Sequence, residues 1–192
     1  LLVQDALPAS PRWLAELVAP LREPGVAGAF SRQIPAPDAS ELARRQLAGW
    51  VAASPEPRRT RLTPQAFAAL PPPERLRACA FDNVSSALRR EVWREHPFPD
   101  TPIAEDVAWG RQVLLAGFEL AYAPASAVIH SHDRSLRYEF ERTRLLHAEL
   151  QRLFGLETIP SARALARAVA ASLPHHLRCL AADASRGAAR AC

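Results

Sequence analysis

The first third of the chain alternates between the strand and helix patterns of apolar residues. Residues 1–3 form a short apolar run, and Gln4 and Asp5 follow it. This pattern indicates a buried parallel strand with a carboxylate at its C-terminal end. Ser10 can cap a helix that ends at Gly25, with an apolar face made by Leu14, Leu17, Val18 and Leu21. Residues 26–31 read as the next strand. Strand, helix and strand in this order predict an α/β fold.

The middle of the chain has a weaker pattern. The stretch 38–41, Asp-Ala-Ser-Glu, resembles a capping box and predicts a helix that runs toward residue 51. Residues 54–75 are rich in proline, so we predict a long loop with at most one short helix, after Thr63-Pro64. A loop of this length is either a functional lid or a disordered surface loop.

Polar residues gather at the ends of predicted elements between residues 81 and 132. Apolar spacing over 103–117 predicts a helix that ends at Gly117 and has Glu105 and Asp106 in its first turn. Acidic side chains are favourable there because the helix dipole presents partial positive charge, so a purely structural function would explain them too. A strand is predicted at 118–122, Pro124 should break it, and a second apolar run ends at His130. A histidine in that position fits a structural residue and a ligand equally well.

Beyond residue 134 the chain has helical spacing. One helix should end at Gly155 and another should start at Ser161. We therefore expect a main domain over 1–135 and a helical extension over 136–192. The apolar faces are short and rich in alanine, which favours packing against the domain or a second subunit, while peripheral contact with a membrane stays open.

Composition narrows the classes of partner. All 24 basic residues are arginines, and they are dispersed rather than gathered with aromatics on one face, so nucleic-acid binding is not expected. Three widely spaced cysteines suit neither a metal knuckle nor a disulfide framework, and they favour a reducing cytoplasm. The chain has no methionine and residue 1 lies inside an apolar run, so we expect it to be the C-terminal part of a longer protein.

A series of short motifs follows a fixed order between residues 83 and 132. They are Asn83, Ser86-Ala87-x-Arg89-Arg90, Phe98-Pro99, Ala104-Glu105-Asp106 with Trp109, Ala116-Gly117-Phe118, Tyr122-x-Pro124 and His130-Ser131-His132. This ordered set resembles the acceptor-side half of the family 2 glycosyltransferases, and among them the rhamnosyltransferase-like members. Asp5 matches the second aspartate of the family's Asp-x-Asp metal segment, and Val3 stands in place of the first.

The resemblance implies part of a GT-A fold, a Rossmann-like mixed sheet flanked by helices. It implies transfer of a sugar, with rhamnose as one candidate, from a nucleotide diphosphate sugar to a hydroxyl of a glycan or lipid-linked acceptor, with inversion, in cell-surface polysaccharide synthesis. The nucleotide pocket would belong to the family's N-terminal half. The enzyme would work in the cytoplasm. Whether it lies at the inner face of the membrane and whether it forms a homo-oligomer both stay open.

The resemblance also assigns chemistry to residues of this chain. Asp106 would be the general base with Glu105 as its helper, and Asp5 and His130 would hold Mg²⁺ or Mn²⁺. Substrate binding would fall to Asn83, Arg89, Arg90, Trp109 and His132. Two other classes stay open. One is a non-catalytic remnant that binds an acceptor or partner, and the other is a metal-dependent hydrolase, although the hydrolytic His-x-x-x-His spacing is missing.

Overall fold

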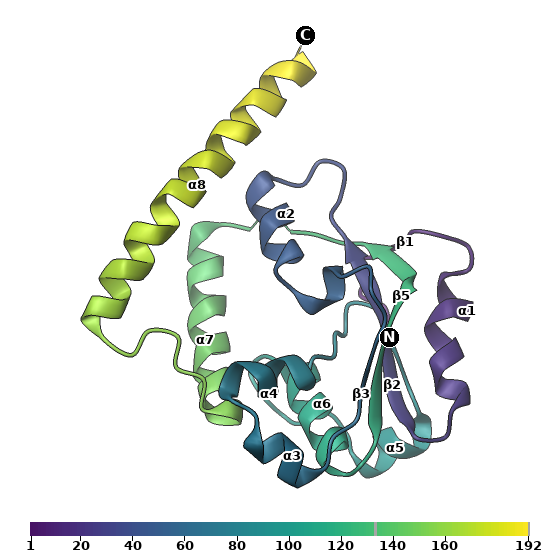
Figure 1. The fold of residues 1–192 in the computed structure, drawn as a ribbon. Helices are drawn as coiled ribbons and strands as arrows, with labels where there is room; N and C mark the ends of the chain where they lie inside the picture. The colour runs from purple at the N-terminus through teal and green to yellow at the C-terminus, as the bar shows by residue number, and fades with distance from the viewer. Residues whose placement is uncertain (133, 192) are drawn as a thin grey trace.

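The computed structural model describes residues 1–132 and 134–191 of the chain, with side chains up to residue 185. The fold is α/β, as expected, with a curled mixed sheet flanked by helices (Figure 1). The strands are β1 (Leu7–Pro8), β2 (Val26–Ile34), β3 (Arg58–Thr60), β4 (Ser86–Leu88) and β5 (Glu119–Ile129). The α-helices are α1 (Trp13–Val18), α2 (Glu41–Ala48), α3 (Pro64–Ala69), α4 (Pro72–Ala78), α5 (Arg90–Glu95), α6 (Glu105–Leu115), α7 (Leu136–Phe154) and α8 (Ala162–Ala191), and two short 3-10 helices are η1 (Ala19–Arg22) and η2 (Val51–Ala53).

The sheet is built on two long parallel strands, β2 and β5. The order across the sheet is β1-β5-β2-β4, and β3 pairs antiparallel with the first part of β5. The prediction that Pro124 ends a strand is wrong, because β5 continues through it to Ile129. The register shifts between Ser31 and Arg32 of β2, so Pro124 lies in an irregular stretch of β5 that is outside the regular pairing. A residue there does not need an N–H for the hydrogen-bond ladder.

The N-terminal run takes a different position from the one predicted. Residues 1–3 were expected to form a buried parallel strand, but Leu2 makes an isolated antiparallel bridge to Ser85, and the Val3 N–H donates to the Val84 carbonyl at 3.0 Å. Leu1 and Leu2 are 60% and 40% exposed, so the run lies at the edge of the sheet. Three apolar residues are too few to fix an interior strand. Asp5 still lies in the turn that follows them.

The proline-rich segment is ordered rather than a long loop. It contains β3, α3 and α4. The predicted short helix is confirmed in α3, where the Thr63 hydroxyl accepts a hydrogen bond from the Ala66 N–H at 3.1 Å. Pro64 and Pro72 each occupy the first position of a helix, where a fixed φ is favourable and no N–H is needed. Proline here begins structure instead of interrupting it.

The core has a larger part and a smaller part on the two faces of the sheet. The larger part lies between the sheet and helices α3, α6 and α7, and the smaller one lies under α1. Phe81 and the fully buried Trp109 are at the centre of the larger part, with ring centroids 4.7 Å apart. Gly28 of β2 makes room for them, since a Cβ there would lie 2.8 Å from the Phe81 ring. Leu150 and Phe154 of α7 also belong to this core, so α7 packs on the main domain.

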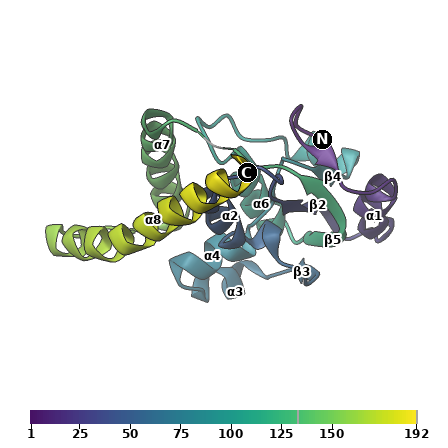
Figure 2. The same cartoon turned by 90° about the horizontal axis from the view of Figure 1, so that it is seen from above.

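Most helix ends agree with the local sequence signals. Ser40 caps α2, and Gly155 ends α7 in the left-handed conformation with φ of 69°. Helix α1 starts at Trp13, later than the Ser10 signal indicated. Helix α8 projects along the outside of the domain (Figure 2), and its Asp183 carboxylate accepts from the Glu41 N–H at the start of α2 at 2.8 Å. Among the residues that the structure describes, no helix combines the length and the apolar character needed to cross a membrane.

Candidate metal and acid site

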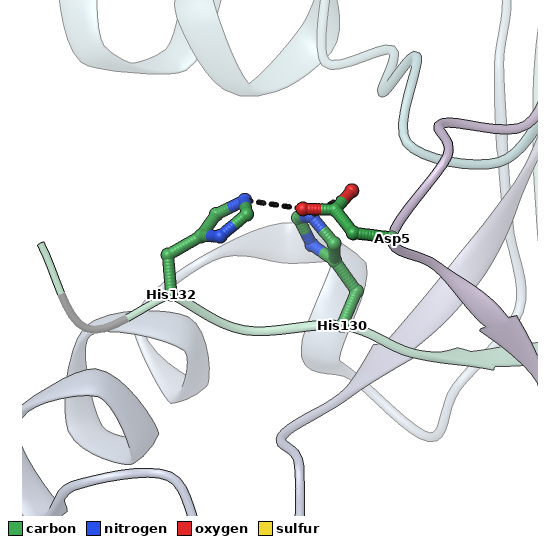
Figure 3. A group of neighbouring side chains, drawn as sticks. All are labelled: Asp5, His130 and His132. Atoms are coloured by element: carbon green, nitrogen blue, oxygen red, sulfur yellow. Dashed lines mark ion pairs between the residues drawn. The ribbon is translucent and has the colours of Figure 1, made fainter.

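Asp5, His130 and His132 meet at the end of the sheet where the parallel strands β2 and β5 finish (Figure 3). His130 Nε2 lies 3.7 Å from Asp5 Oδ1, and His132 Nε2 lies 3.5 Å from Asp5 Oδ2. Strand β1 explains how Asp5 reaches the histidines, because Leu7 pairs with Ile129 and so holds the preceding turn against the end of β5. Residues more than 120 positions apart in the sequence therefore form one group.

The donor set of this group fits a divalent cation. One ligand atom from each residue lies within 4.8 Å of the other two, and small side-chain rotations would bring all three to the distance of about 2.0 to 2.2 Å at which such atoms bind a metal. The Asp5 side chain is 50% exposed, so the site is open to solvent. One carboxylate and two imidazoles suit Mn²⁺ and the later divalent transition metals better than Mg²⁺, which prefers oxygen ligands. His132, expected to bind substrate, is placed with the candidate metal ligands.

A buried chain of hydrogen bonds sets the orientation of His130. The Gln33 side-chain amide donates to Asp82 Oδ2 at 2.6 Å, which turns its carbonyl oxygen toward His130 Nδ1 at 2.9 Å. His130 Nδ1 therefore carries the proton and donates, and Nε2 presents its lone pair to the side where Asp5 lies. Burial also lowers the pKa of His130, which favours the neutral imidazole that binds metals. This arrangement is typical of the outer partners that orient a metal-ligating histidine.

Asp82 is the buried centre of this network. It is 7% exposed, and it also accepts from the Trp50 indole N–H at 2.9 Å and from the Val84 N–H at 3.0 Å. Burial raises the pKa of the Asp82 carboxyl, and these three donors act against that rise. Neither Asp82 nor Gln33 was singled out in the sequence, although Asp82 directly follows the buried apolar residues 79–81.

Asp106 lies at the start of α6 in a partly buried position. Burial, together with the negative charges of Asp82 and Glu105, raises the pKa of the Asp106 carboxyl to about 7. Its Oδ1 accepts from the Val107 N–H at 2.7 Å, and its Oδ2 has a longer contact of 3.4 Å with the Asn83 N–H. A carboxylate with a pKa near neutrality is suited to accept a proton from a substrate hydroxyl.

The backbone before α6 sets the direction of the two acids. Ala104 has φ of 61° and ψ of 31°, a left-handed conformation that is uncommon for alanine and that turns the chain into the helix. Glu105 and Asp106 follow at once, and the Asn83 side-chain amide contacts Glu105 Oε1 at 3.4 Å. Asn83 therefore contacts both acids, Asp106 through its backbone N–H and Glu105 through its side-chain amide. Strained backbone of this kind is often found at functional sites.

Three residues that were expected to bind substrate lie elsewhere. The Arg89 guanidinium donates to the carbonyls of Leu21 and Val26, at 2.5 and 3.0 Å, near the end of β2 that is opposite to Gln33. Arg90 is exposed at the first position of α5. Trp109 is 0% exposed and its indole N–H donates to the His96 carbonyl. Arg89 and Trp109 thus bind backbone carbonyls of neighbouring segments. Asn83 contacts Glu105 and Asp106, and His132 lies with Asp5 and His130.

Comparison with known proteins gives two curated relatives. The chain is 32% identical over 162 residues to the O-antigen chain rhamnosyltransferase RfbN of Salmonella typhimurium. The aligned segment covers 80% of this chain and 49% of the relative. It is also 37% identical over 81 residues to the O-antigen chain rhamnosyltransferase WbaN of Salmonella anatum, and that aligned segment covers 38% of this chain and 26% of the relative. The chain thus spans about half the length of the first relative. No family model and no solved structure matches it. The two similarities support a glycosyltransferase.

Proposed function

We propose that this chain forms the acceptor side of an inverting family 2 glycosyltransferase with a GT-A fold. The enzyme transfers a sugar, with rhamnose as the first candidate, from a nucleoside diphosphate sugar to a hydroxyl of a cell-surface glycan or its lipid-linked precursor. One observation carries the proposal. A partly buried acid with a pKa of about 7 and an Asp-His-His group occur together, in a chain similar to two rhamnosyltransferases. The charge of Asp82 acts on the acid, and Gln33 links Asp82 to His130 by hydrogen bonds.

In this proposal Asp106 is the general base. It accepts the proton of the acceptor hydroxyl while that oxygen forms its bond to the anomeric carbon and the nucleoside diphosphate departs from the opposite face. Oδ2 is the reactive oxygen, since among the described residues its hydrogen bond is the long 3.4 Å contact with the Asn83 N–H. Glu105 helps to place the acceptor and keeps negative charge beside Asp106, which sustains the raised pKa.

The second requirement of the reaction is positive charge at the leaving diphosphate. Asp5, His130 and His132 would hold Mn²⁺ or Mg²⁺, which when bound supplies that charge. Gln33 and Asp82 keep His130 in the tautomer that can bind the ion. The exposed carboxylate of Asp5 allows the ion and the donor phosphates to reach the site from solvent.

The test is an assay of the intact protein with a panel of nucleoside diphosphate sugars and a glycan acceptor. We expect nucleoside diphosphate release that depends on both acceptor and Mn²⁺, and a product of inverted anomeric configuration by NMR. Asp106→Asn should lower turnover at least about 100-fold, whereas Asp100→Asn, an exposed aspartate in the loop before α6, should leave it unchanged. Equal sugar release in the absence of acceptor would instead indicate a hydrolase, and normal turnover of Asp106→Asn would exclude it as the base.

A further inference from the structure

The two histidines of the metal group are held in different ways. His130 has a hydrogen bond of its own, in which Nδ1 lies 2.9 Å from the Gln33 carbonyl oxygen. The His132 side chain is 32% exposed, and among the described residues its polar partner is Asp5, which is itself a candidate ligand. The two imidazole rings lie edge to face with centroids 4.5 Å apart, and both are turned toward the carboxylate (Figure 3). The direction of His132 therefore depends on the backbone that carries it.

Ser131, between the two histidines, ties this backbone to the end of β2. The His130 N–H donates to the Ile34 carbonyl at 2.9 Å, one residue beyond the last pair of β2 and β5. Pro35 follows and has no N–H, so the next donor on that side is the Ala36 N–H. This group donates to Ser131 Oγ at 3.1 Å. Two bonds thus hold the segment that carries the histidines, and the second is made by the residue directly before His132.

The loop that supplies the Ala36 N–H is itself held by one side chain. Arg44 of α2 donates to the carbonyls of Ala36, Pro37 and Ala39 at 3.0, 2.7 and 3.1 Å. A guanidinium presents several N–H groups in a fixed plane, so one side chain can bond to three carbonyls of a short loop. Arg44 therefore fixes residues 36–39 relative to α2, and with them the donor to Ser131.

We propose that Ser131 is a positioning residue of the metal group, and that its bond with the Ala36 N–H holds His132 in place for the ion. Arg44 acts one step further away, by fixing the loop to which Ser131 is tied. The inference rests on the metal group of the proposed function, and it adds two residues that act through a ligand rather than on the ion. Outer contacts of this kind change the affinity of a metal site by about 10- to 100-fold.

The experiment measures Mn²⁺ binding by the full 192-residue chain in calorimetry, with no sugar donor or acceptor present. Ser131→Ala should weaken Mn²⁺ affinity about tenfold, and Ser131→Thr, which keeps the hydroxyl, should stay within about twofold of the unchanged chain. Arg44→Gln should weaken the affinity by a smaller factor of about three. In a chain that already carries His132→Ala, Ser131→Ala should cause no further loss, because the ligand through which Ser131 acts is absent.

Two matched controls make the same chemical changes at other contacts. Ser54→Ala removes a hydroxyl that accepts from the Glu56 N–H at 3.1 Å, the same distance as at Ser131. Arg45→Gln removes the neighbouring arginine of α2, which donates to the Glu41 carboxylate. Both controls should bind Mn²⁺ like the unchanged chain.

The urea midpoint of each variant is measured as well, since a merely structural contact would lower stability and leave Mn²⁺ affinity unchanged. Unchanged affinity in Ser131→Ala, or an equal further loss beside His132→Ala, would overturn the inference and leave the proposed transferase standing. Absence of Mn²⁺ binding to the unchanged chain would overturn the inference together with the metal group. Failure of sugar transfer by the intact protein, with the effect of Ser131→Ala on Mn²⁺ affinity as expected, would contradict the proposed function alone.

Discussion

Asp106→Asn should make the protein more stable at alkaline pH while it abolishes turnover. The carboxyl of Asp106 has a pKa of about 7 in the folded chain, against the ordinary value of 3.8. Between these two values the folded state keeps a proton that the unfolded state has lost, so the free energy of unfolding falls as pH rises through this window. Above about pH 7 the folded protein holds a buried carboxylate at a cost of about 4 kcal/mol. Asparagine has no proton to lose, and the variant avoids that cost.

The structure also provides an opposing effect that does not change with pH. Asp106 accepts from the Val107 and Asn83 N–H groups, and an asparagine has one carbonyl oxygen with which to replace the two carboxylate oxygens. Loss of an acceptor for a buried donor costs about 1 to 3 kcal/mol. At about pH 5 the linkage cost is already about 1.7 kcal/mol, so we expect Asp106→Asn to be close in stability to the unchanged chain there. At about pH 8 the variant should be more stable, with a relative change of about 2.5 kcal/mol between the two pH values.

The assay is urea unfolding followed by tryptophan fluorescence, carried out at both pH values, with Asp100→Asn as the matched control. The slope of free energy against urea should stay the same, so that the shift in midpoint reports stability alone. The difference between Asp106→Asn and the unchanged chain should rise with pH, and the difference for the control should stay flat. A flat difference for Asp106→Asn as well would refute the burial argument, because the carboxyl would then titrate alike in the folded and unfolded chains.

The other predictions concern the metal group and the core. Asp5→Ala and His132→Ala should each weaken Mn²⁺ binding by calorimetry at least about tenfold, and their combination should cost less than the sum, because both residues serve one ion. Gln33→Ala should lower Mn²⁺ affinity about tenfold without removing a ligand. Unchanged affinity would show that Gln33 does not affect metal binding by His130. Gly110→Ala should lower the urea midpoint by the equivalent of at least about 2 kcal/mol, since its Cβ would lie 2.2 Å from a backbone carbonyl, while Gly25→Ala, with nothing within 4 Å, should be near neutral.

Local signals in the sequence were sufficient for several elements. The 3.6-residue period predicted a helix over 103–117 with Glu105 and Asp106 in its first turn, and α6 begins at Glu105 with both acids in that turn. Gly155 ended α7 where expected. These features depend on neighbours within one or two turns. The continuation of β5 through Pro124 was missed, because it depends on how β2 pairs with it, and the irregular stretch that accommodates the proline is a property of the pair.

The site shows the same division between local and distant contacts. Asp5 and His130 were paired through the resemblance, and the structure joins them by means of β1, a strand of two residues that no period could reveal. His132 could have been added from the sequence alone, because side chains two residues apart in an extended segment point to the same side. Gln33 and Asp82 are separated by 49 positions and make a side-chain bond across the core, and nothing local to either residue indicates that contact.

Asp82 makes the two halves of the site depend on each other. Through Gln33 its carboxylate holds His130 Nδ1 protonated, and through space its charge contributes to the raised pKa of Asp106. The three donors to this carboxylate lower its pKa against the effect of burial, and they come from the loop of Trp50, the turn at Val84 and the end of β2. In the proposed reaction, the acid that would accept the proton and the histidine that would hold the ion therefore both depend on the buried carboxylate of Asp82.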